Sequence, residues 1–291
     1  MKIQTFTVVS GNAACNAGCP FCVSKMTGIK SIGFKPTKVN WRNFDKACRV
    51  AELNGITTVL LTGKGEPTLF PDQLTEYFRH LQKYNFPILE LQTNAVLFAE
   101  QEEKYDKYLR EWYELGLTII SISVVHYDSE KNRANYLPGK KEYPELGKLI
   151  AKLHEIGFSV RFSVVLIKDH IDTPVEAEAM IQKAKEWGVE QVSLRPVAAP
   201  EESESEKYKI DTLNLMLTPE KIAKLNKWAE KRGRLLLSYG HNSRIFDIDG
   251  QNVCLTDALT IKPSTDDIRQ MIFFPDGHIR FDWQYKGAII L

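Results

Sequence analysis

Short apolar runs alternate with amphipathic segments along the first two thirds of the chain. The apolar runs are rich in Val, Ile and Leu with little alternation, which is typical of parallel strands covered on both faces. This pattern predicts strands over residues 3–9, 56–62, 86–92, 117–125, 158–167 and 189–194. Apolar positions at helical spacing predict helices over residues 41–54, 72–84, 99–115, 144–156 and 174–187. The chain therefore repeats a strand–helix unit.

A glycine stands between the end of a predicted helix and the next strand at four places: Gly55, Gly116, Gly157 and Gly188. Glycine adopts the left-handed conformation that ends a helix without a steric penalty. The repeated placement supports the same boundaries in each unit. Right-handed crossovers would curl such units into a partial (β/α)6 barrel, so we expect an α/β fold of this type.

The rhythm changes after the sixth strand. Residues 196–217 are polar with an acidic run and predict a loop, and residues 218–232 predict one more helix. Beyond them lie short β-like pieces at 235–238, 245–248, 271–274 and 278–283, with a hairpin turn at 274–278. We therefore expect a barrel core over 1–195, a connecting loop and last barrel helix over 196–233, and a C-terminal β-rich extension over 234–291 that caps the barrel.

The overall charge gives no support for two classes of partner, although a local basic patch would be compatible with it. The 38 Lys and Arg residues nearly balance the 37 Asp and Glu residues, for a formal net charge of +1. This balance favours neither nucleic acid nor an anionic membrane as a partner. The N-terminal residues lack the basic start and apolar run of a signal peptide, and no apolar stretch approaches the roughly 20 residues that span a bilayer. We expect a cytoplasmic protein.

Three of the five cysteines lie within eight residues, at Cys15, Cys19 and Cys22. In a reducing cytosol, clustered thiols indicate metal ligands rather than disulfides. A structural zinc site needs four ligands, but Cys48 and Cys254 are single and remote. A cubane iron–sulfur cluster normally takes four thiolates, so three would leave one iron open to another ligand.

The Cys-x-x-x-Cys-x-x-Cys spacing directly after the first strand resembles the signature of the radical S-adenosylmethionine (SAM) superfamily, and the resemblance extends over residues 1–195. It implies a [4Fe–4S] cluster on Cys15, Cys19 and Cys22, with SAM chelating the open iron. It further implies reductive cleavage of SAM to a 5′-deoxyadenosyl radical, which abstracts a hydrogen atom from the substrate. A flavodoxin- or ferredoxin-type protein would supply the electron.

Other segments match the motifs of this family. Residues 63–67, Gly-Lys-Gly-Glu-Pro, resemble the Gly-Gly-Glu-Pro turn that receives the SAM amino group, with Lys64 in the place of the first glycine. Relatives often carry Thr-Asn-Gly where this chain has Thr-Asn-Ala95. The resemblance assigns SAM binding to Phe21, Gly63, Lys64, Gly65, Glu66, Thr93, Asn94, Ser121, Ser123, Ser163 and Arg195.

Two further residues are candidates for catalysis. His126 follows the fourth strand on the expected catalytic face, where a histidine can act as a general acid or base, or simply bond a loop carbonyl. Cys254 lies in the expected cap, and some epimerases of the family quench a carbon radical with a cysteine hydrogen. An isolated cysteine is more often buried and inert.

Three functions remain open at this point. The first is a radical SAM enzyme that acts on a small molecule or nucleotide, which the lack of further cysteine clusters favours over auxiliary-cluster enzymes. The second is a peptide-modifying enzyme, such as an epimerase that uses Cys254 as hydrogen donor. The third is a noncatalytic iron–sulfur redox sensor. The identity of the substrate does not follow from the sequence.

Overall fold

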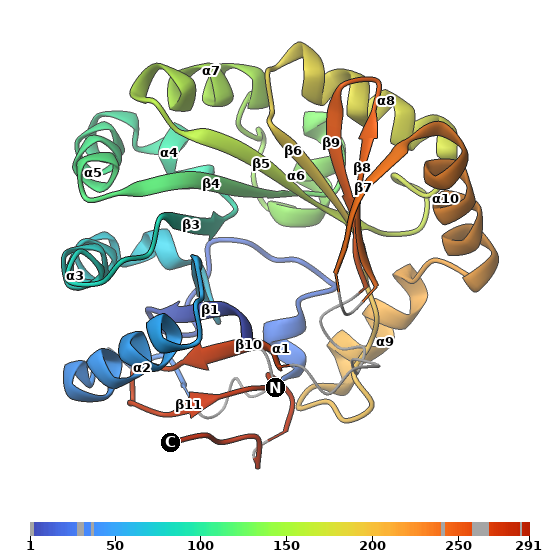
Figure 1. Cartoon of the computed structure of the whole chain (residues 1–291). Helices are drawn as coiled ribbons and strands as arrows, with labels where there is room; N and C mark the ends of the chain where they lie inside the picture. Colours follow the sequence, from blue (N-terminus) through green and yellow to red (C-terminus); the bar gives the residue numbers. More distant parts are fainter. Residues whose placement is uncertain (1–2, 28–31, 36–37, 240–241, 258–267, 286) are drawn as a thin grey trace.

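A curved sheet with helices on its convex side forms the fold (Figure 1). The computed structural model describes residues 3–27, 32–35, 38–239, 242–257, 268–285 and 287–291. All six predicted strands are present as parallel neighbours: β1 (Ile3–Ser10), β2 (Thr58–Gly63), β3 (Ile88–Thr93), β4 (Leu117–Val124), β5 (Ser159–Leu166) and β6 (Gln191–Pro196). The predicted α/β partial barrel is confirmed.

The helices follow the predicted pattern with one division. They are α2 (Trp41–Leu53), α3 (Pro71–Leu81), α4 (Val96–Glu100), α5 (Glu102–Glu114), α7 (Leu146–Ile156), α8 (Pro174–Glu186) and α10 (Pro219–Arg232). The segment predicted as one helix over 99–115 is split at Gln101, whose backbone leaves the helical region. In α2 the Asn40 side chain caps the first turn by accepting from the backbone N–H of Asn43 at 3.1 Å.

The four glycines after the helices have the left-handed backbone that the sequence predicts. Their φ angles are 67° at Gly55, 90° at Gly116, 114° at Gly157 and 75° at Gly188. At Gly157 a Cβ atom would also lie 2.7 Å from the ring of Tyr113, so space as well as backbone conformation requires glycine there.

The C-terminal strands join the same sheet at both of its edges. They are β7 (Arg234–Tyr239), β8 (Ser243–Ile248), β9 (Gln251–Leu255), β10 (Ile268–Phe273) and β11 (Ile279–Arg280). The strand order is β11-β10-β1-β2-β3-β4-β5-β6-β9-β8-β7, with β10 parallel to β1 and β9 parallel to β6. This arrangement differs from the cap that we expected over 234–291, because the backbone of these strands pairs with the open edges of the barrel. The division into three domains stays a prediction.

Some short elements do not follow from the hydrophobic pattern. They are α1 (Val23–Met26), the 3₁₀ turn η2 (Pro67–Leu69), α6 (Ser129–Tyr136), α9 (Glu206–Leu215) and β9. We expected a loop over 196–217, and this prediction was wrong for the part that forms α9. The apolar residues of α9 do not gather on one face of the helix, and its buried residue is Thr212. In β9 buried and partly buried residues alternate, but the first buried position is the polar Gln251, so the sequence shows no regular apolar alternation. The Gln251 side-chain amide is satisfied by donating to the Val189 carbonyl at 2.9 Å.

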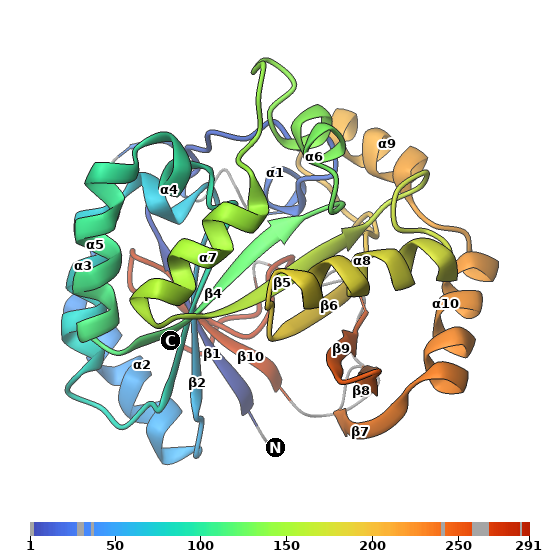
Figure 2. The same cartoon turned by 90° about the horizontal axis from the view of Figure 1, so that it is seen from above.

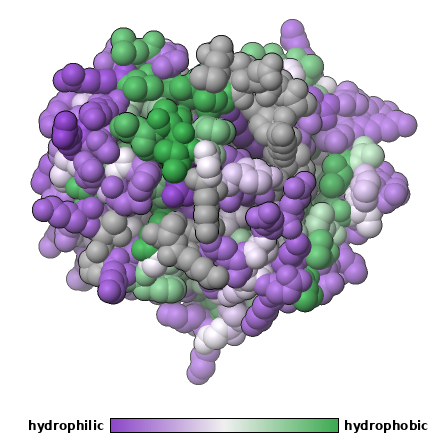
Figure 3. All heavy atoms as spheres, turned by 90° about the horizontal axis from the view of Figure 1, so that it is seen from below, coloured by the Kyte–Doolittle hydropathy of each residue, from purple (hydrophilic) through white to green (hydrophobic). Residues whose placement is uncertain are grey.

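The carboxyl ends of the parallel strands point to one side of the molecule. Figure 2 shows the arrowhead of β4 directed towards the side where α1, α6 and α9 lie. The face seen from below is largely hydrophilic, with its main gathering of apolar side chains at the upper left (Figure 3). Within the described residues, no helix combines the length and apolar character needed to cross a bilayer. Functional groups are expected where the strands end.

Candidate functional site at the carboxyl ends of the strands

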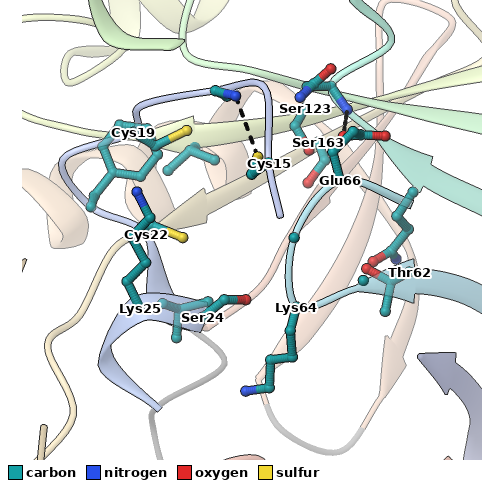
Figure 4. Close-up of a pocket in the computed structure, with 18 of the residues that line it drawn as sticks. Cys15, Cys19, Cys22, Ser24, Lys25, Thr62, Lys64, Glu66, Ser123 and Ser163 are labelled. Atoms are coloured by element: carbon teal, nitrogen blue, oxygen red, sulfur yellow. Dashed lines mark hydrogen bonds between the residues drawn. The ribbon is translucent and has the colours of Figure 1, made fainter. Parts of the chain in front are cut away.

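A cavity of about 280 Å³ lies at the carboxyl ends of the strands, and we call it the cysteine cavity. Figure 4 shows the side chains around it. The structure brings most of the sequence-predicted residues together here. They are Cys15, Cys19, Phe21, Cys22, Gly63, Lys64, Gly65, Glu66, Thr93, Asn94, Ser123, Ser163 and Arg195. Ser121, His126 and Cys254 do not line it.

The three thiols stand on the loop between β1 and α1, and their sulfur atoms face a common space (Figure 4). Cys15 is exposed and Cys19 is partly buried, and burial raises the pKa of the Cys19 thiol. Among the described residues, no three His, Cys, Asp or Glu side chains are placed to hold one metal ion. Three thiolates that face one space could each bind a different iron of a cluster and leave the fourth iron open.

Hydrogen bonds within the cysteine loop and to residues outside it hold the loop in place. The Gly18 N–H donates to the Tyr136 carbonyl on α6 at 2.7 Å. The Asn12 side chain donates to the Phe34 carbonyl at 2.9 Å, and its oxygen accepts from the Ala14 N–H at 2.8 Å. Phe21, which is 7% exposed, meets Tyr136 edge to face with ring centroids 6.0 Å apart. These contacts fix the position of the cysteine loop relative to α6.

The turn of residues 63–67 packs directly against the cysteine loop. The Glu66 N–H donates to the Ala14 carbonyl at 2.9 Å, one residue before the first cysteine. A Cβ atom at Gly65 would overlap that carbonyl oxygen and would lie 2.8 Å from the backbone carbonyl oxygen of Asn12. Gly65 is therefore needed for the close approach of the two loops.

Lys64, which departs from the family motif, is directed away from the three sulfurs (Figure 4). Its ammonium donates to the Thr27 carbonyl at 2.6 Å and lies 4.9 Å from the ring centroid of Trp283. Burial lowers the pKa of Lys64 to about 8. The long side chain is thus accommodated beside the site, and the turn keeps its glycine at position 65.

The Glu66 carboxylate is buried at 4% exposure and organises the turn around it. One oxygen accepts from the Thr68 N–H at 3.1 Å, the Thr68 hydroxyl at 2.7 Å and the Thr93 hydroxyl at 2.6 Å. The other oxygen accepts from the Asn94 N–H at 2.9 Å. Burial raises the pKa of Glu66, and these hydrogen bonds oppose that shift. The second oxygen has one partner among the described residues and can accept another donor.

The strand residues differ in what they face. Ser123 and Ser163 are direct neighbours across β4 and β5, and both line the cavity. Ser121 is buried and accepts from Nε of Arg161 at 3.3 Å, so it supports that arginine instead of lining the cavity. Ala95, in the place of the family's glycine, has a left-handed backbone with φ of 57°.

The cavity also contains residues that sequence reasoning missed. They are Ala13, Ala17, Val23, Ser24, Lys25, Thr62, Pro67, Gln92, Tyr136, Val165, Pro196, Val197 and Ala198. The rule that polar side chains at strand ends face the catalytic side could have found Thr62 and Gln92. Tyr136 lies on α6, which has no amphipathic signal, so nothing in the sequence pointed to it.

His126 is buried beside the site but lines neither this cavity nor the larger one described below. Its Nδ1 accepts from the Asp128 N–H at 2.9 Å. The Lys131 ammonium lies 3.2 Å from Nε2. Burial, followed by the charge of Lys131, lowers the pKa of His126 to about 4. These contacts describe a neutral loop histidine.

Acidification is expected to destabilise the fold through this histidine. Between pH 6.5 and 4 the unfolded chain binds a proton at His126 that the folded chain does not, so the free energy of unfolding falls as the pH falls. From pH 7 to pH 5 the loss is about 2 kcal/mol for this group alone. Urea unfolding at both pH values should show a smaller difference for His126→Gln. Equal differences in wild type and variant would contradict this placement.

Cys48 and Cys254 have different surroundings. Cys48 is fully buried on α2, as its helical spacing predicts. Cys254 lies on β9 beside Ser193 of β6 and lines a larger cavity of about 720 Å³ inside the barrel, which we call the barrel cavity. Burial raises the pKa of the Cys254 thiol.

Comparisons with known proteins agree with this arrangement. A family model described as the radical SAM superfamily matches residues 9–181. No curated protein sequence matches the chain. Among solved structures, SuiB from Streptococcus suis bound to its precursor peptide SuiA is similar with a TM-score of 0.62 and 14% identity. The alignment covers 96% of this chain and 59% of SuiB, so the chain spans about three fifths of that neighbour's length.

Two other structures are similar at comparable levels. The structure of anSMEcpe with bound AdoMet has a TM-score of 0.60 and 12% identity, covering 99% of this chain and 77% of that one. A radical SAM methyltransferase from Sphaerobacter thermophilus has a TM-score of 0.56 and 18% identity, covering 86% of this chain and 66% of that one. At such identities the likeness concerns the fold.

Proposed function

The chain belongs to the radical SAM superfamily, whose enzymes use a [4Fe–4S] cluster and SAM, and we propose that it removes a hydrogen atom from a small-molecule or nucleotide substrate. One observation carries the proposal: three thiols face one cavity that also contains the buried Glu66 carboxylate. A redox sensor needs no such carboxylate beside its thiols, so this arrangement argues against the sensor alternative.

The residues present fit the two cofactors. Three thiols that line one cavity form the donor set for a cluster with one open iron. The close approach at Gly65 leaves room for backbone alone between the two loops. When bound, the cluster and SAM supply a 5′-deoxyadenosyl radical as the hydrogen acceptor.

The chain's own residues would bind and orient SAM. The free acceptor position on Glu66 suits an ammonium group, since a buried carboxylate forms strong charge-assisted hydrogen bonds. The Ser123 and Ser163 hydroxyls stand side by side for the ribose or carboxylate. Phe21 packs against Tyr136 at the cavity wall and would lie beside the cluster. These roles are binding and positioning.

Deoxyadenosine formation tests the proposal. We would supply the iron-reconstituted protein anaerobically with SAM and dithionite, adding buffer, the low-mass filtrate of a cell extract, or its peptide-containing retentate. Stimulation by the filtrate supports a small-molecule or nucleotide substrate, and replacement of dithionite by a flavodoxin or ferredoxin tests the expected electron donor. No deoxyadenosine from protein with a verified cluster and bound SAM would refute the proposal.

A peptide-modifying epimerase is the second candidate, because Cys254 lines the barrel cavity next to the cysteine cavity. A thiol there can donate a hydrogen atom to a carbon radical from the substrate. This candidate predicts stimulation by the retentate, deuterium in the product after turnover in D₂O, and loss of that label in Cys254→Ala. Equal labelling in wild type and variant would rule out this role of Cys254.

A further inference from the structure

The barrel cavity adjoins the cysteine cavity. Its wall includes inward-facing residues of β1, β2, β5, β6, β9 and β10, and its volume of about 720 Å³ suits a small molecule. Thr62, Gln92 and Arg195 line both cavities, so no wall of other residues separates the two at these positions. A molecule in the barrel cavity would therefore lie beside SAM in the cysteine cavity.

Three guanidinium groups line the barrel cavity, and one of them is neutralised. Arg161 forms an ion pair with Glu90, which is 1% exposed, and it also donates to the Ser121 hydroxyl at 3.3 Å. Gln92 donates to the same Glu90 oxygen at 2.9 Å. Arg161 and Glu90 thus form a fixed, charge-balanced part of the wall.

Arg195 and Arg269 are not balanced in this way. Nε of Arg195 is buried and has no hydrogen-bond partner in the part of the chain that the structure describes. Arg269 donates to the Thr256 hydroxyl at 3.3 Å, which is a neutral acceptor. Burial, and then the positive charges of Arg269 and Arg161, lower the pKa of Arg195 to about 10. The two guanidiniums therefore repel each other in a poorly solvated space.

Nearby carboxylates compensate this charge in part. The Glu90 carboxylate partly opposes the lowering of the Arg195 pKa that burial causes, but it is already paired with Arg161. Burial lowers the pKa of Arg269, and the nearby Asp257 carboxylate opposes that shift while accepting from the Asn242 side chain at 2.7 Å. Three guanidiniums thus share two carboxylates among the described residues, while Lys64, which also lines the cavity, has the carboxylates of Glu204 and Asp282 near its ammonium. A buried guanidinium is costly unless an anion accepts its hydrogen bonds.

We propose that the barrel cavity binds an anionic group of the substrate, a phosphate or a carboxylate, between Arg195 and Arg269. Either anion presents several acceptor oxygens to the planar donors of a guanidinium and relieves the repulsion between them. The inference deepens the proposed function, on which it rests, by giving the substrate a negative charge. Arg269 lines the barrel cavity but not the cysteine cavity. A change at Arg269 therefore tests binding of the substrate anion separately from binding of SAM.

Direct binding tests the inference independently of turnover. Isothermal titration of the reconstituted, SAM-loaded protein would use inorganic phosphate and succinate as probes. We expect at least one of them to bind, about tenfold more weakly in Arg269→Gln and more weakly at higher salt. The matched control is Arg79→Gln, because Arg79 is exposed and paired with Glu111 between the outer helices α3 and α5. Arg79→Gln should bind the probe like wild type.

Two results would overturn the inference. One is that neither probe binds wild-type protein with normal iron and SAM content. The other is that Arg269→Gln binds the probe as tightly as wild type does. If Arg269→Gln does not fold by circular dichroism, Arg269→Lys keeps the charge without the planar donors, and an affinity equal to that of wild type would then count against the site.

The substrate itself supplies the second measurement. The low-mass filtrate would be divided on an anion-exchange resin, and each part assayed for stimulated deoxyadenosine formation. Activity in the retained part supports the inference, and activity in the unretained part alone contradicts it. Phosphatase treatment that removes the stimulating activity identifies a phosphate, and resistance identifies a carboxylate. If no part yields deoxyadenosine, the proposed function fails, while the titration still decides whether the anion site exists.

Discussion

Cys15→Ala is expected to lose the iron–sulfur cluster and all SAM-dependent deoxyadenosine formation. With two thiols left, the donor set falls below the three that hold a cubane with one open iron. Iron and sulfide analysis after anaerobic reconstitution measures the first effect, and chromatography of the reaction mixture measures the second. We expect cluster content to fall at least about tenfold, as for the removal of a metal ligand or its support.

Cys48→Ala is the matched control for this change. The Cys48 thiol is fully buried on α2 and does not line the cysteine cavity, so its loss removes a small core volume and no ligand. Its cluster content should equal that of wild type. Equal loss in both variants would mean that the effect comes from misfolding, and full cluster content in Cys15→Ala would disprove the ligand assignment.

Gly65→Ala is expected to have the second largest effect. The added methyl group would overlap the Ala14 carbonyl, which is backbone and cannot rotate away, so the two loops must separate. The hydrogen bond from the Glu66 N–H to that carbonyl would be lost, and Glu66 would shift relative to the thiols. We expect about 2–4 kcal/mol lower stability and a loss of SAM binding of about a hundredfold or more.

Equilibrium dialysis with labelled SAM and chemical unfolding measure these two effects. Gly139→Ala is the control, since a Cβ atom there meets nothing within 4 Å and the residue has no positive φ. It should bind SAM like wild type. Normal SAM affinity in Gly65→Ala would show that the close approach of the loops is not needed for the site.

The sequence was sufficient for the elements that bury continuous apolar runs. The six parallel strands and the glycines after their helices were predictable because burial on both faces and a left-handed backbone each leave a local signature. The cysteine loop and the Gly-Lys-Gly-Glu-Pro turn were recognisable from residue spacing. Their contact through Ala14 and Gly65 was not, because it depends on how two loops meet.

The edges of the sheet and the barrel cavity could not be predicted in the same way. Sequence order gives no register between β9 and β6 or between β10 and β1, so the C-terminal strands were expected as a cap. Arg161 and Arg269 are far apart in the chain, so the sequence does not show that both line the same cavity. His126 follows the end of a strand, as expected of a catalytic residue. Its ring, however, contacts Asp128 and Lys131 of the following loop and helix.

The pairing of β1 with β10 has a consequence for the growing chain. Ile3 of β1 pairs with Ile268 of β10. The edge of β1 that faces β10 therefore stays unpaired until nearly the whole described sequence has been synthesised. At ribosomal speeds of about 5–20 residues per second, that interval is about 10 to 50 seconds. During it the strand presents unpaired backbone groups next to the cysteine loop. Synthesis of this protein therefore includes a period in which β1 lacks its neighbour on one side and the barrel is still open at that edge.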